Sequence, residues 1–139
     1  MYLHPPDPAL AARIAAVGRS WGEGFEIVGV EDWKSVIRSY GGLVVHLTMY
    51  GLPLDRVLPR IRRSPDVLLV VGGAKVPPDL YRLSDLNVAV GHQPHSEVAA
   101  VAVVLDRLGG IPPPSRRSRA RQAIVPRARG KKIARRRGR

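Results

Sequence analysis

Short apolar runs alternate with amphipathic segments along most of this 139-residue chain. Apolar positions repeating every three to four residues indicate helices, and short runs that are apolar throughout and end in glycine indicate buried strands. The predicted helices span residues 7–22, 31–42, 54–63, 77–84 and 96–108, and the predicted strands span residues 25–30, 43–47, 66–73 and 87–91. Apolar strands separated by helices are typical of a parallel sheet covered on both faces, so the pattern predicts an α/β fold.

The last predicted helix is apolar on every side. Its eight consecutive apolar residues, Val98 to Leu105, are far too few to cross a bilayer. A helix without a polar side is expected to be buried on every side. That would be unusual for the last helix of a small domain, which normally covers one face of a sheet.

Three of the predicted strands end in glycine or small residues that are followed by polar groups. "LVVHL" runs into "TMYG", "VLLVV" into "GGAKVP", and "NVAV" into "GHQPHSE". In a parallel sheet these exits share one edge, where ligands bind in α/β folds, and glycine lets a ligand approach the backbone. We therefore expect a small-molecule pocket at the exits. The alternative is that Gly72, Gly73 and Gly91 only form tight turns.

Other kinds of site receive less support from the sequence. It contains neither GxGxxG nor GxxxxGK[ST], so no dinucleotide fingerprint or P-loop is present. His92 and His95 have a spacing that metal ligands use, but no third ligand is evident and Pro94 lies between them, so no metal is expected. Ser96 beside His95 suggests a nucleophile and base, although helix capping suits this serine better. His46, inside an apolar strand, is expected to be a core residue.

Positive charge is concentrated at the end of the chain. Residues 1–114 carry eleven basic and eleven acidic side chains, whereas residues 115–139 carry twelve basic side chains and no acid, which accounts for the net charge of +12. This density of arginine favours a polyanion such as RNA, and a solvated tail that only aids solubility is the alternative. The candidate RNA-binding residues are Arg116, Arg117, Arg119, Arg121, Arg127, Arg129, Lys131 and Lys132.

Length and composition narrow the class of protein further. The absence of cysteine excludes a disulfide scaffold and a thiolate metal site. No signal peptide is visible, so we expect a soluble, cytoplasmic protein without membrane contact. The length fits one domain. We expect an α/β domain over residues 1–114 and a basic extension over residues 115–139 that is partly packed, up to about residue 133.

The segments "VVHLTMYG", "VVGGAKVP" and "NVAVGHQPHSEVAAVAVVLDRL" resemble signature segments of the archaeal tRNA cytidine-56 ribose 2′-O-methyltransferases, a family of the SPOUT superfamily. The likeness runs from about Tyr2 to about Ile133 and includes "IVPRARGKKI". It implies a SPOUT-type fold with a deep C-terminal trefoil knot, in which the last helix threads through a loop, and a homodimer. It also implies that S-adenosylmethionine is the cofactor and that the ribose of cytidine 56 in the T-loop of tRNA is the substrate.

The resemblance also implies a set of cofactor-binding residues, many of which would act through their backbone. Gly73-Ala74 stands where the family usually has Ala-Glu, so one carboxylate is missing. The implied residues are Leu47, Gly72, Gly73, Ala74, Lys75, Val76, Val90, Gly91, His92, Gln93, Pro94, His95, Ser96 and Glu97.

No catalytic residue of this chain is identified by the resemblance. The family begins with one further strand and helix, which carry a Gly-His-Arg-Pro segment and the arginine held to act on the ribose hydroxyl, and Met1 falls about where the second strand begins. Two interpretations follow: a tRNA 2′-O-methyltransferase, or a catalytically impaired RNA-binding remnant that still binds S-adenosylmethionine. A different α/β nucleotide-binding regulator is a third alternative.

Overall fold

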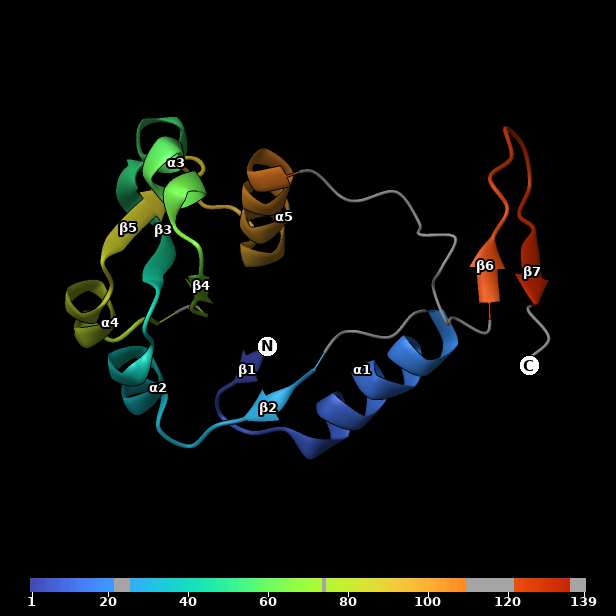
Figure 1. Ribbon diagram of the computed structural model, residues 1–139, viewed down its shortest axis with the longest axis horizontal. Coiled ribbons are helices and arrows are strands. Elements are labelled where there is room, and N and C mark those ends of the chain that lie inside the picture. The colour runs from blue at the N-terminus through green and yellow to red at the C-terminus, as the bar shows by residue number, and fades with distance from the viewer. Residues whose placement is uncertain (22–25, 74, 110–121, 136–139) are drawn as a thin grey trace. The chain divides into compact units, whose positions relative to one another are not determined.

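The computed structural model describes residues 1–21, 26–73, 75–109 and 122–135. The chain forms two compact units, one made of residues 1–32 and 113–139 and the other of residues 33–112 (Figure 1).

The unit of residues 33–112 is built on a three-stranded parallel sheet. Strand β3 (Leu43–Pro53) lies between β4 (Val67–Val71) and β5 (Leu86–Ala89). Helix α3 (Leu54–Arg63) connects β3 to β4, and helix α4 (Pro78–Leu83) connects β4 to β5. The predicted α/β fold with a parallel sheet is therefore confirmed in this unit.

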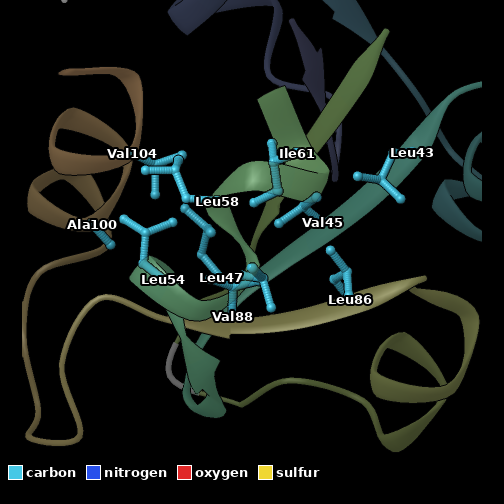
Figure 2. Close-up of a cluster of buried hydrophobic side chains, with 11 residues drawn as sticks. Leu43, Val45, Leu47, Leu54, Leu58, Ile61, Leu86, Val88, Ala100 and Val104 are labelled. Atoms are coloured by element: carbon cyan, nitrogen blue, oxygen red, sulfur yellow. The ribbon is translucent and has the colours of Figure 1, made fainter. Parts of the chain in front are cut away.

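Apolar side chains pack on both faces of this sheet, which explains why its strands are apolar throughout. One face carries α3 and α5 (Glu97–Gly109), and Figure 2 shows their side chains directed toward β3 and β5. The buried residues of this cluster are Leu43, Val45, Leu47, Leu54, Val57, Leu58, Ile61, Leu86, Val88, Ala100 and Val104. The other face carries α2 (Trp33–Ser39) and α4 around the buried residues Ile37, Val44 and Leu80.

Helix α5 is buried on one side only. Ala100 and Val104, four residues apart and therefore on the same side, are 3% and 0% exposed. Val98 and Leu105 are 78% and 49% exposed. The prediction that this helix is buried on every side is wrong for the single chain, because the sheet covers only the Ala100 side.

The other unit contains two small sheets and one long helix. Strand β1 (Tyr2–Leu3) pairs in parallel with β2 (Val28–Gly29), and helix α1 (Pro8–Trp21) lies between them in sequence. The carboxylate of Asp7 caps α1 by accepting a hydrogen bond from the Leu10 amide at 2.8 Å. Strands β6 (Gln122–Ile124) and β7 (Ile133–Arg135) form an antiparallel hairpin inside the basic segment, which the sequence analysis did not predict. No helix in the described ranges is long and apolar enough to span a membrane.

Candidate functional site

The three strand exits singled out in the sequence lie at one edge of one sheet. Leu47 on the central strand pairs with Val71 on one side and with Val88 on the other. Because the three strands are parallel, the residues that follow these positions emerge at the same edge. The structure therefore brings together "TMYG", "GGAKVP" and the segment that leads into α5.

Strand β3 makes an excursion at this edge. Leu47 and Leu52 both pair with Val88, so the four intervening residues leave the ladder and return to it. A Cβ atom on Gly51 would lie 2.3 Å from the Val88 amide nitrogen and 2.4 Å from the Asn87 carbonyl carbon. Backbone atoms cannot move aside, so this position requires glycine. Tyr50, within the excursion, is 73% exposed.

The sequence analysis did not select Tyr50 or Gly51 as site residues. The signal was available in "TMYG", where an aromatic residue precedes a glycine directly after a buried strand. Only the return of the strand to Val88 shows that this glycine is packed against backbone. The excursion thus holds an exposed aromatic ring at the edge where the three exits meet.

The exit of β4 has room beside its second glycine. A Cβ atom on Gly72 would meet Cγ2 of Val76 at 2.4 Å, so the chain turns back on itself here. A Cβ atom on Gly73 would have no described atom within 4 Å. Lys75 is exposed. Ala74 lies outside the described residues.

A hydrogen bond connects the exit of β5 to the β3 excursion. Nε2 of His92 donates a hydrogen bond to the carbonyl oxygen of Gly51 over 3.3 Å. Of the described atoms, only Cδ2 of His95, at 3.8 Å, would meet a Cβ atom on Gly91, so the space beside this glycine is open. Val90 is half-buried, and Gln93, Pro94 and Glu97 are exposed.

Ser96 acts as a helix cap in this structure. Its hydroxyl oxygen accepts a hydrogen bond from the Ala99 amide at 3.4 Å, the geometry expected of an N-cap residue. Nδ1 of His95 lies 3.4 Å from the backbone carbonyl oxygen of Ser96. The geometry therefore fits the capping prediction and gives no support to a nucleophile and base formed by these two residues.

His46 anchors a buried polar network directly before Leu47. Its Nδ1 donates to the side-chain oxygen of Asn87 at 2.8 Å, and the Asn87 amide donates to the Tyr81 carbonyl at 2.9 Å. The rings of His46 and Tyr81 meet edge to face with their centroids 4.8 Å apart. Burial lowers the pKa of His46, and the hydrogen bond to Asn87 opposes that effect only in part. The prediction of a core histidine is confirmed for its burial, since His46 is 0% exposed, but a fully hydrogen-bonded side chain is not found, because Nε2 has no partner among the described residues.

The fully buried Nε2 atom of His46 has no hydrogen-bond partner in the part of the chain that the structure describes. Because Nδ1 carries the proton that Asn87 accepts, Nε2 holds the free lone pair of the neutral ring. Protonation at Nε2 would place an N–H group where nothing described accepts it, which agrees with the lowered pKa of this residue. His46 is therefore a neutral structural residue and is not poised to exchange protons with a substrate.

The candidate RNA-binding residues fall partly within the β6–β7 hairpin. Arg127, Arg129, Lys131 and Lys132 are exposed there, and Gly130 has a φ of 77°, which places it in the left-handed region that glycine adopts readily. The remaining candidates, Arg116, Arg117, Arg119 and Arg121, lie outside the described residues.

A cavity of about 360 Å³ lies in the unit of residues 1–32 and 113–139, and none of the strand exits lines it. It is lined by Trp21 and by residues of the hairpin between Ile124 and Ile133. Within the described residues, no group of three histidine or acidic side chains is placed to hold a metal ion.

The sequence of the chain matches a known protein family and several of its members. Residues 21–134 match the family model for tRNA ribose 2′-O-methyltransferases. A tRNA (cytidine(56)-2′-O)-methyltransferase from Archaeoglobus fulgidus is 44% identical over 133 residues, which cover 96% of this chain and 79% of that protein. Proteins of the same name from Methanopyrus kandleri and Cenarchaeum symbiosum are 46% and 40% identical, over 93% and 96% of this chain and 75% and 78% of the relatives.

Proposed function

The chain belongs to the tRNA ribose 2′-O-methyltransferase family, and from that premise we propose that it transfers a methyl group from S-adenosylmethionine to the ribose 2′-oxygen of cytidine 56 in the T-loop of tRNA. The observation that carries the proposal is the convergence of three glycine-bearing strand exits at one edge of one parallel sheet. The relatives are named as tRNA (cytidine(56)-2′-O)-methyltransferases, which supports the choice of nucleoside.

The proposed cofactor-binding residues are those that the resemblance implied, namely Leu47, residues 72–76 and residues 90–97. The open space beside Gly73 and Gly91 fits a ligand that approaches the backbone closely. Backbone N–H and C=O groups would make most of the polar contacts, as in many cofactor sites. This arrangement explains why the exits contain glycine and proline rather than a set of charged side chains.

S-adenosylmethionine supplies, when bound, a methyl group already activated by a positively charged sulfur. The chain's own contribution is therefore to orient the ribose hydroxyl and to keep the reacting groups aligned. The exposed ring of Tyr50 and the β3 excursion lie at the same edge and border the space that the ribose would enter. We assign no residue of the chain to the removal of the hydroxyl proton.

Two further features of the family are part of the proposal, a C-terminal trefoil knot and a homodimer. The knot rests on the family resemblance alone. The dimer is supported by the exposed apolar side of α5, which carries Val98, Val103 and Leu105. A second copy that covers this side would remove an apolar surface from water.

We also propose that residues 1–114 supply the catalytic domain and that the basic extension, residues 115–139, binds the tRNA backbone. The exposed cations of the β6–β7 hairpin support this assignment. Each phosphate contact should add to the salt dependence of binding. A hairpin holds its side chains in a defined arrangement, so less conformational entropy is lost on binding than by an extended chain.

A methyl-transfer assay with two RNAs tests the proposed function. One is an unmodified tRNA transcript, and the other carries 2′-deoxycytidine at position 56. We expect transfer of labelled methyl groups from S-adenosylmethionine to the first RNA and not to the second. Equal labelling of both RNAs would refute the proposed target, and tight binding of tRNA and cofactor without any transfer would instead fit the RNA-binding remnant.

A further inference from the structure

Helix α3 carries three arginines on the side that faces away from the core. Arg56, Arg60 and Arg63 are four and three residues apart, so they line one side of the helix, and all three are exposed. The buried residues Leu54, Val57, Leu58 and Ile61 occupy the opposite side, packed on the sheet (Figure 2). We refer to Arg56, Arg60 and Arg63 as the α3 arginine stripe.

The other charged side chains of α3 have partners within the chain. Asp55 accepts a hydrogen bond from the Arg107 guanidinium at 3.0 Å, and Arg62 donates to the Arg107 carbonyl at 2.6 Å. These contacts fasten α3 to α5. The structure gives the stripe arginines no hydrogen bond or ion pair to any described residue. The stripe is therefore free to contact a molecule outside the chain.

A stabilising effect on helix α3 does not explain why these three arginines are present. Like charges three and four residues apart on one side of a helix repel one another. Arg60 and Arg63 lie near the C-terminus of the helix, where the dipole favours cations, but Arg56 lies in the first turn, where it does not. A cation that costs stability and forms no ion pair with a described residue fits an external anion.

The stripe begins at the edge where the strand exits meet. Pro53, which directly precedes α3, pairs with Ala89, and the chain after Ala89 continues into Val90 and Gly91. Arg56 is therefore only three residues beyond this pairing. From Arg56 to Arg63 the helix rises by about 10 Å, at roughly 1.5 Å per residue. This length is enough for the stripe to contact more than one phosphate of a nucleic-acid strand.

We propose that the α3 arginine stripe binds consecutive phosphates of the tRNA backbone and so positions the RNA against the edge where the exits meet. The identity of the RNA rests on the proposed function. The planar guanidinium group can donate two parallel hydrogen bonds to one phosphate, which suits arginine to this role better than lysine. Phosphate contacts fix orientation and carry no sequence information. The stripe belongs to the unit of residues 33–112, whereas the basic extension belongs to the other unit.

The test compares two full-length variants with the same change in charge. The first replaces the stripe by glutamine (Arg56→Gln, Arg60→Gln and Arg63→Gln). The control replaces three exposed arginines on three different helices, α1, α2 and α4 (Arg13→Gln, Arg38→Gln and Arg82→Gln). Binding of tRNA is measured over a range of salt concentrations, together with the dissociation constant for S-adenosylmethionine and the thermal unfolding midpoint.

We expect the stripe variant to lower the slope of log affinity against log salt by about two, from a loss of roughly 0.7 to 0.9 per phosphate contact. The control should lower it by less than about one, by the same reasoning. Cofactor affinity should match the parent in both variants, because the stripe lies outside the proposed cofactor segments.

Equal slopes for the stripe variant and the control would overturn the proposal while leaving the proposed function intact, provided that the parent chain still methylates tRNA. A parent chain that neither binds nor methylates tRNA would overturn the proposed function and the role of the stripe together. Loss of cofactor affinity in the stripe variant alone would show that the arginines support the cofactor edge, which also contradicts the proposal.

Discussion

The residue that best shows how the interior supports the exit edge is His46. Its place in an apolar strand was enough to predict a core histidine, since the flanking positions are all apolar. Its partners were not predictable, because Asn87 and Tyr81 are more than thirty residues away in sequence and reach it only through the pairing of β3 with β5. The same pairing makes Gly51 obligatory, so both residues depend on a contact that periodicity cannot reveal.

The lowered pKa of His46 predicts a specific pH dependence of stability. As the pH falls below about 6.5, the ordinary pKa of histidine, the unfolded chain takes up a proton on this residue while the folded protein does not. The free energy of unfolding should therefore fall as the pH drops from that value toward the lower pKa of the folded state. Urea unfolding at pH 7.5 and at pH 5.5 measures the difference.

The matched variant for this measurement is His46→Gln, which cannot titrate and keeps an N–H donor for Asn87. The loss of stability between the two pH values should be smaller in this variant than in the parent. An identical loss in both proteins would show that His46 does not contribute to the pH dependence.

Most helices and strands of the unit of residues 33–112 follow from the sequence pattern, but their lengths and exposed sides do not. The strand predicted over residues 43–47 continues to Pro53, because the chain returns to pair with Val88 after its excursion. Pro59 lies inside α3, as the sixth of its ten residues. The apolar packing of Val57, Leu58 and Ile61 offsets the hydrogen bond that proline cannot donate.

The two sides of α5 could not be distinguished from the sequence, because every position from Val98 to Leu105 is apolar. The structure predicts that substitutions on the two sides of α5 have different effects on the free energy of unfolding. Val104→Asp would bury a carboxylate without a partner and should lower the free energy of unfolding by about 3 kcal/mol or more. Val98→Asp, at a position that is 78% exposed, should change it by less than about 0.5 kcal/mol in the monomer.

Chemical unfolding of the two α5 variants tests this difference, and sedimentation reports the oligomeric state at the same concentrations. If the proposed dimer covers the exposed side of α5, Val98→Asp should weaken the dimer while leaving the unfolding of the monomer nearly unchanged. Equal destabilisation of the monomer by both substitutions would contradict the one-sided burial of this helix.

At the scale of the whole molecule, the sequence predicted the meeting of the exits because the geometry of parallel sheets requires it. Once "LVVHL", "VLLVV" and "NVAV" are recognised as parallel strands, their ends must share an edge. The basic segment was less predictable, because a run of arginines resembles a solvated tail whatever its structure. The pairing of Ile124 with Ile133 across a turn that contains Gly130 organises part of it into a hairpin.

Calorimetry with two glycine variants tests most directly the claim that the strand exits form the site for S-adenosylmethionine. Gly91 lies at the exit edge and Gly41 lies before the opposite end of β3, and a Cβ atom at either position would meet no described atom closer than 3.8 Å. Both Gly91→Val and Gly41→Val should therefore fold. The parent and Gly41→Val should bind with a dissociation constant on the order of micromolar, and Gly91→Val should bind at least tenfold more weakly, a loss of about 1.4 kcal/mol. Parent-like binding by Gly91→Val would contradict the claim.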